Sequence, residues 1–76
     1  MGAFDGFTVG SRLILLRNAY GFADAGTQVE VVAVLQPGDA DGAIRLADDG
    51  IRVKRADGAD HGMCEFIGAY GRKYFE

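Results

Sequence analysis

The fold is decided by residues 26–36, which read Gly26-Thr27-Gln28-Val29-Glu30-Val31-Val32-Ala33-Val34-Leu35-Gln36. This stretch has the highest density of β-branched and aliphatic residues in the sequence, and Pro37-Gly38 follows it directly. Branched side chains favour a pleated strand and a Pro-Gly pair ends one, so the stretch predicts a strand. Strict alternation gives it one uniformly apolar face, made of Val29, Val31, Ala33 and Leu35. We expect this strand to lie at the centre of a small β-barrel.

Four further strands are predicted around it, and they are Val9–Arg17, Ala43–Ala47, Ile51–Arg55 and Met63–Ile67. Asp48-Asp49-Gly50 is the strongest hairpin signal, because Asp-Gly tolerates the positive φ values of a tight turn. Five short strands with almost no helical periodicity predict an all-β fold, a small five-stranded, partly open barrel. Residues 1–8 are interpreted as a short, loosely packed N-terminal arm whose Phe4 and Phe7 plug the end of the barrel, and residues 68–76 as an aromatic C-terminal tail.

The chain has 76 residues and a formal net charge of −3. This length predicts one domain over residues 1–76, with marginal stability because so short a chain buries only about 60% of its unfolded surface. The single cysteine, Cys64, excludes an intrachain disulfide and fits a reducing compartment. The sequence shows neither a signal peptide nor a span-length apolar run, so we expect a cytoplasmic protein without a membrane partner. The acidic balance argues against a generic nucleic-acid binder, because phosphate affinity needs surplus Lys and Arg.

Signals for catalysis or metal binding are few. His61 lies three residues before Cys64, but only Asp57 or Asp60 is at hand to orient an activated thiolate. The same acids with His61 offer too few of the ligands that zinc prefers. Asp39-Ala40-Asp41-Gly42 begins like a calcium loop, yet the twelfth position of that loop is a glycine. We therefore predict no catalytic residues, no metal and no cofactor.

Two sets of residues are candidates for binding a partner. The loop at residues 18–26 either folds over a barrel mouth or forms a recognition surface for a protein. The candidate protein-binding residues of this loop and of the tail are Tyr20, Phe22, Asp24, Tyr70 and Tyr74. The candidate anion- or nucleic-acid-binding residues are Arg45, Arg52 and Lys54 on the outer face of the predicted hairpin, with Arg55 nearby. The alternative for the basic set is a solvated face balanced by acidic residues in the surrounding turns.

Apolar residues are also predicted on the side of the sheet that faces away from the core. These residues are Ile14 and Leu16 of one strand and Val32 and Val34 of the next. A small monomer should not leave such a patch in contact with water. Either the arm and the tail cover it or a second subunit does, so a homodimer remains an open alternative.

Several segments resemble an SH3-like small β-barrel of the KOW-like variety, and also small phage and plasmid proteins of that shape. The segments are Gly10-Ser11-Arg12-Leu13, Ala25-Gly26-Thr27 before Val29-Glu30-Val31-Val32, Gly42-Ala43-Ile44-Arg45-Leu46 and Asp48-Asp49-Gly50. The resemblance covers about residues 9–67. It implies an SH3-like barrel and, for the KOW-like variety, an association with nucleic acid.

Three functions are open at this point. We expect a non-catalytic protein-interaction module, such as a phage or plasmid accessory protein that modulates a host protein complex. One alternative is a KOW-like nucleic-acid-associated domain that uses the basic hairpin face. The other alternative is an oligomeric enzyme whose site forms at the subunit interface.

Overall fold

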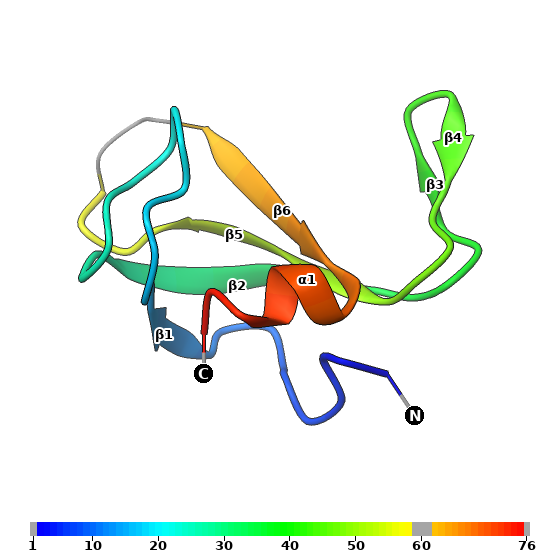
Figure 1. Ribbon diagram of the computed structural model, residues 1–76, viewed down its shortest axis with the longest axis horizontal. Helices are drawn as coiled ribbons and strands as arrows, with labels where there is room; N and C mark the ends of the chain where they lie inside the picture. The colour runs from blue at the N-terminus through cyan, green and yellow to red at the C-terminus, as the bar shows by residue number, and fades with distance from the viewer. Residues whose placement is uncertain (1, 59–61, 76) are drawn as a thin grey trace.

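The computed structural model describes residues 2–58 and 62–75 of the chain (Figure 1). Its elements are β1 (Arg12–Ile14), β2 (Gln28–Leu35), β3 (Ala40–Asp41), β4 (Ile44–Arg45), β5 (Gly50–Arg55), β6 (Met63–Ile67) and α1 (Gly68–Arg72). Strands therefore dominate the regular structure, and the only helix in these ranges is a short one after β6. The prediction of an all-β fold is confirmed.

The main sheet is antiparallel, with the strand order β1-β2-β5-β6. β2 pairs with β1 on one side and with β5 on the other, as expected for a strand with apolar residues on both faces. Within the described ranges β1 and β6 are the two edges and do not pair with each other, so the sheet is not closed. The five-stranded, SH3-like barrel stays a prediction.

A bulge divides β2 into two halves. The pairing with β5 shifts register between Val31 and Ala33, and one extra residue, Val32, inverts the alternation beyond it. Val34 therefore lies opposite the fully buried Ile51 and packs against the core. The expectation that Ala33 continues the inner face of Val31 is wrong for this reason.

The predicted hairpin between residues 43–47 and 51–55 is also wrong. β4 pairs with β3, and β5 pairs only with β2 and β6 in the part of the chain that the structure describes. The segment predicted as a strand at residues 43–47 pairs with the residues just before it instead. Leu46 donates its N–H to Asp39 O at 2.9 Å and accepts the Gly38 N–H at 2.8 Å. The resulting two-stranded ribbon projects away from the sheet (Figure 1).

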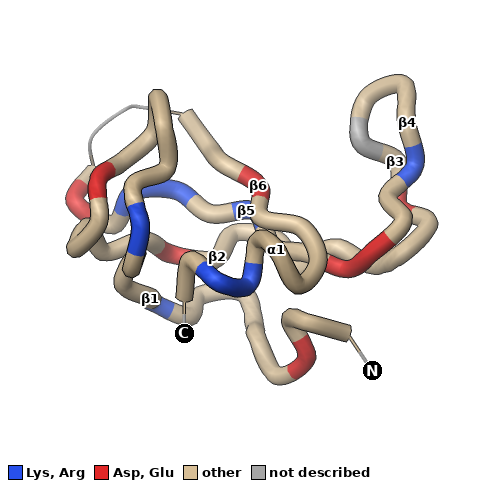
Figure 2. The backbone as a smooth tube through the Cα atoms, viewed as in Figure 1, with Lys and Arg blue, Asp and Glu red and all other residues tan. Residues whose placement is uncertain are grey.

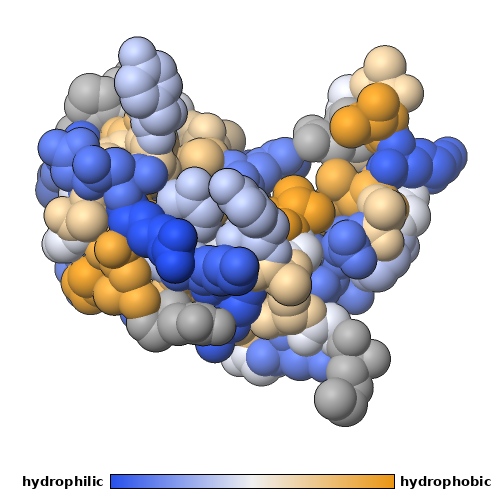
Figure 3. Space-filling model, in the orientation of Figure 1, coloured by the Kyte–Doolittle hydropathy of each residue, from blue (hydrophilic) through white to orange (hydrophobic). Residues whose placement is uncertain are grey.

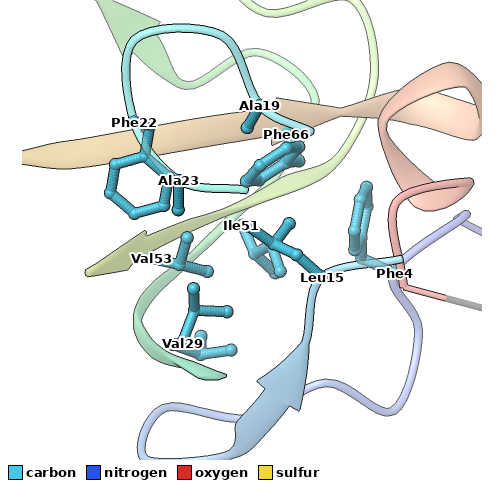
Figure 4. Close-up of a cluster of buried hydrophobic side chains, with 10 residues drawn as sticks. Phe4, Leu15, Ala19, Phe22, Ala23, Val29, Ile51, Val53 and Phe66 are labelled. Atoms are coloured by element: carbon cyan, nitrogen blue, oxygen red, sulfur yellow. The ribbon is translucent and has the colours of Figure 1, made fainter. Parts of the chain in front are cut away.

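One contiguous core holds the sheet, the loop after β1 and the N-terminal arm together (Figure 4). Its buried members are Phe4, Leu15, Ala19, Phe22, Ala23, Val29, Val31, Ile51, Val53 and Phe66. Phe4 is only 2% exposed, and its ring meets that of Phe7 edge to face at 5.2 Å. The arm is thus part of the core, and the expectation of loose packing is wrong.

Asp49 fixes the arm in place. Its carboxylate is buried and accepts hydrogen bonds from the backbone N–H groups of Ala3, at 3.0 Å, and Phe4, at 2.8 Å. These bonds satisfy two donors that would otherwise be buried without a partner. The Asp49 carboxylate therefore attaches the N-terminal arm to the sheet.

The C-terminal tail packs against the core and touches the N-terminal arm, because the Arg72 guanidinium lies over the Phe7 ring at 4.9 Å. Leu16 donates its backbone N–H to Tyr74 O at 2.8 Å, which ties the tail to the end of β1. The Phe66 ring lies 4.9 Å from the ring of Tyr74 and 4.8 Å from that of Phe75. The tail thus covers the end of the core beside β6 and gives α1 a fixed position.

The outer apolar patch is smaller than the alternation predicts. Val32 is half-buried, and Val34 belongs to the inner face beyond the bulge. Ile14 and Leu16 are about half exposed, at 47% and 48%. The structure holds a single chain, so the homodimer stays a prediction.

Candidate functional site

The loop after β1 folds back on itself and sends its two aromatic side chains in opposite directions. Ala19 and Ala23 form an isolated antiparallel bridge, and Asn18 Oδ1 accepts the Ala25 N–H at 2.8 Å. Tyr20, at the tip, is fully exposed, whereas Phe22 is 8% exposed and belongs to the core. Phe22 therefore packs in the core, as the first interpretation of this loop predicts. Tyr20 is the aromatic residue of the loop that is exposed and available for recognition.

A groove of about 340 Å³ brings together the tyrosines that the sequence singles out. Its lining includes Tyr20 from the loop, Tyr70 and Tyr74 from the tail, and residues 64–67 of β6. Tyr70 is 77% exposed and Tyr74 is half-buried. The remaining predicted loop residue, Asp24, is exposed and lines a different hollow, next to Arg55.

The groove follows the free edge of β6. Successive side chains of a strand point to opposite faces, so a hollow that touches four consecutive residues lies against the edge and not against one face. β6 has β5 on its inner side and, among residues 2–58 and 62–75, no strand on its outer side. The binding surface therefore combines tyrosine side chains with the backbone of an edge strand.

A close approach between α1 and β6 builds the groove wall. A methyl group placed on Gly71 would come within 2.8 Å of the Phe66 carbonyl carbon, so only glycine lets the helix lie this close to the strand. Gly68, with a φ of +65°, makes the turn from β6 into α1. These two glycines place Tyr70 and Tyr74 beside the strand edge.

Cys64 lies in the groove as a half-buried free thiol. Burial raises the pKa of this thiol above its ordinary value; a hydrogen bond with the backbone of Glu65 partly opposes the rise, and the negative charge of Glu65 adds to it. A raised pKa leaves less thiolate at neutral pH, and the thiolate is the nucleophile. The residue is therefore less reactive than an ordinary cysteine.

This predicts slow alkylation of Cys64. The rate with iodoacetamide at neutral pH should be several-fold lower for the folded protein than for the urea-unfolded chain, with its midpoint displaced to higher pH. The measurement is a pH–rate profile followed by mass spectrometry, with the unfolded chain as control. Coinciding profiles would mean that burial does not perturb this thiol.

The basic residues do not share one hairpin face. Arg45 lies on the projecting ribbon and donates to Gly38 O at 3.0 Å. Arg52 lies on β5 and donates from Nε to Oε2 of Glu65, on β6, at 2.7 Å. The expected grouping of Arg45 with Arg52 and Lys54 is wrong, because it required β4 to pair with β5.

Of the other two basic residues, Lys54 shares the outer face of β5 with Arg52, as predicted, and Arg55 does not. Lys54 is exposed on the outer face of β5, opposite Glu30 of β2. Arg55 points to the other side and pairs with Asp57 at 2.7 Å. The four basic candidates are therefore divided between two sheets and both faces of β5, and two of them are in ion pairs with carboxylates.

The metal and thiolate hypotheses are tested only in part. His61 and Asp60 lie outside the described residues, so the pairing of His61 with Cys64 is not described. Within residues 2–58 and 62–75, no group of three or more His, Cys, Asp or Glu side chains is arranged to hold a metal ion. The Asp39 carboxylate accepts the Gln36 N–H at 2.8 Å and shapes the turn after β2.

Comparisons with protein-family models, with curated proteins and with solved structures found no match to this chain. Among the described residues, none of the helical structure has the length and apolar character needed to cross a membrane. The function has to be argued from the site itself, because a fold class alone does not define one.

Proposed function

We propose that this protein is a non-catalytic protein-interaction module that binds its partner in the groove beside β6. The observation that carries the proposal is the meeting of Tyr20, Tyr70 and Tyr74 around one strand edge, although they come from opposite ends of the sequence. Exposed tyrosines supply large contact areas with little loss of side-chain entropy, and they are frequent in binding surfaces. The resemblance to an SH3-like barrel is in keeping with a small binding module.

The nucleic-acid alternative has less support. It relied on four basic side chains on one face, and these are distributed over the ribbon and both faces of β5. The net charge of −3 also opposes binding to phosphate backbones. The interface-enzyme alternative and a role as a phage or plasmid accessory protein stay predictions from the sequence.

A peptide-display selection tests the proposal. Short random peptides are enriched on the immobilised wild-type protein, and the best binder is measured against a Tyr20→Ala/Tyr70→Ala variant. Because buried aromatic contacts dominate binding energies, we expect its affinity to fall by about 10- to 100-fold. Both tyrosines are exposed, so the fold should be retained, which circular dichroism verifies.

The matched control is the Val9→Ala/Ile44→Ala variant. It removes two side chains of similar exposure, 65% and 64%, that lie outside the groove. This variant should bind the peptide as the wild type does. Equal losses in the two variants, or no enrichment on the wild-type protein, would contradict the proposed function.

A further inference from the structure

The edge of β6 that pairs with no described strand presents backbone groups to the groove. Gly68 donates its N–H to Asp49 O at 2.8 Å, which makes this opposed pair a hydrogen-bonded one. Opposed residues of an antiparallel ladder alternate between hydrogen-bonded and non-hydrogen-bonded pairs. In the register of β5 with β6, Arg52 opposite Glu65 is then a non-hydrogen-bonded pair. The N–H and C=O of Glu65 therefore point away from β5, toward the outside of the sheet.

The same alternation applies to the two ends of β6. Met63, opposite Lys54, also directs its backbone groups outward. Ile67, opposite Gly50, directs its N–H outward, while its carbonyl stands at the N-cap of α1. An edge with donors and acceptors at every second residue is complementary to an extended peptide, which presents the same repeat.

Charge at the rim of the groove selects among peptides. Lys73 is exposed, with its Nζ 6.0 Å from the centre of the Tyr70 ring. Arg17 is exposed and follows Leu16, whose N–H donates to the carbonyl of the groove residue Tyr74, so the Arg17 backbone lies close to the groove. Basic segments and a hydrophilic stripe mark this side of the molecule (Figures 2 and 3).

Neither of these cations forms an ion pair with a described residue. Within the described ranges, the ion pairs involve Arg12, Arg52 and Arg55 only, not Arg17 or Lys73. The one acid in the groove, Glu65, is bound to Arg52, which turns its carboxylate to the outer face of the sheet. The rim is thus locally positive on an acidic protein, and it favours an acidic partner over a second copy of this chain.

We infer that the partner is an acidic, extended peptide segment that adds a strand to β6 and packs its side chains against the groove tyrosines. Strand addition gives affinity through main-chain hydrogen bonds and specificity through alternate side chains. The inference rests on the proposed function, because it names the chemistry of the partner for the same groove.

An N-methyl scan of the best library peptide tests strand addition. Methylating one amide at a time removes one donor, and we expect the affinity to fall by about tenfold or more at every second position and to change little between them. Affinity loss without alternation would overturn strand addition while leaving the proposed function intact. A library that yields no groove-dependent peptide would overturn both.

A matched pair of protein variants tests the same bond from the other side. Glu65→Pro and Glu65→Ala both remove the ion pair with Arg52, but only proline also removes the outward N–H. Proline is tolerated on an edge strand whose N–H faces outward, so both variants should fold. We expect Glu65→Pro to bind the peptide at least about tenfold more weakly than Glu65→Ala does. Equal affinities of two folded variants would overturn the inference.

A further set of measurements tests the charge of the bound peptide and the kind of molecule that binds the groove. Enriched peptides should be acidic, and Arg17→Glu/Lys73→Glu should weaken their binding several-fold at low salt, with a smaller effect at high salt. Enrichment of basic peptides would overturn the charge assignment. Displacement of the peptide by oligouridylate would show that the groove binds nucleic acid, which would overturn the inference. A dimer in light scattering that Glu65→Pro dissociates would show that a second copy of the chain occupies the edge of β6, which would also overturn it.

Discussion

The Phe4→Ala variant should lose about 3–5 kcal/mol of unfolding free energy. Phe4 is 2% exposed and packs in the main core, so the substitution removes a large apolar contact and leaves a cavity. A chain of 76 residues has a total stability on the order of 4–11 kcal/mol. The variant should therefore be largely unfolded in mild urea, and equilibrium urea unfolding followed by circular dichroism measures the loss.

The control for this prediction is Val9→Ala. Val9 is 65% exposed just beyond the arm, so its truncation should change stability by no more than about 0.5 kcal/mol. If both variants unfolded at the same urea concentration, the arm would contribute nothing to the core. Its packing would then be as loose as the sequence predicts.

The central strand and the all-β class could be predicted from the sequence because they depend on local patterns. A dense run of branched residues with a Pro-Gly pair after it defines β2 wherever its partners lie. The bulge at Val32 could not be predicted, because a single extra residue leaves the apolar pattern unchanged and reveals itself only in the register with β5.

Strand partners are a tertiary property, and they explain the errors in the basic set. An Asp-Gly pair between two alternating segments predicts a hairpin, but the backbone of Leu46 forms its hydrogen bonds with Gly38 and Asp39 instead. Because β4 pairs with β3 in the ribbon, Arg45 does not lie beside Arg52. The ion pair of Arg52 with Glu65 likewise depends on β5 lying next to β6.

The tyrosines of the groove could be named from the sequence, but their meeting could not. Aromatic residues in a glycine-rich loop and in a tail are visible as candidates, yet no local signal joins Tyr20 to Tyr70. Phe22 was grouped with Tyr20 because both belong to the loop. The bridge between Ala19 and Ala23 turns one ring outward and the other into the core. That β6 is an edge strand follows only from the strand order of the sheet, which the sequence does not give.

The Asp49→Ala variant should lose about 2–4 kcal/mol, the second-largest effect that the structure predicts. The buried carboxylate accepts the N–H groups of Ala3 and Phe4, and hydrogen bonds to a charged group are stronger than neutral ones. Without it, both donors lose their partner near the core. Asp49→Asn should fall between the wild type and Asp49→Ala, because an amide keeps one accepting oxygen.

The neighbouring Asp48 provides the control. It is an exposed aspartate one residue away, so Asp48→Ala should change stability by no more than about 0.5 kcal/mol. Urea unfolding of the three variants in one buffer measures the series. Similar losses in Asp48→Ala and Asp49→Ala would show that the effect belongs to the turn and not to the buried carboxylate.

A double-mutant cycle then determines what Asp49 does. If its carboxylate stabilises the protein by holding the arm so that Phe4 stays in the core, the two effects overlap. Asp49→Ala/Phe4→Ala should then lose less than the sum of the two single losses, with a coupling of about 0.5–3 kcal/mol. Additive losses would mean that the ring stays buried without the carboxylate. The arm would then be held by apolar packing alone, and the two N–H bonds would stabilise only its backbone.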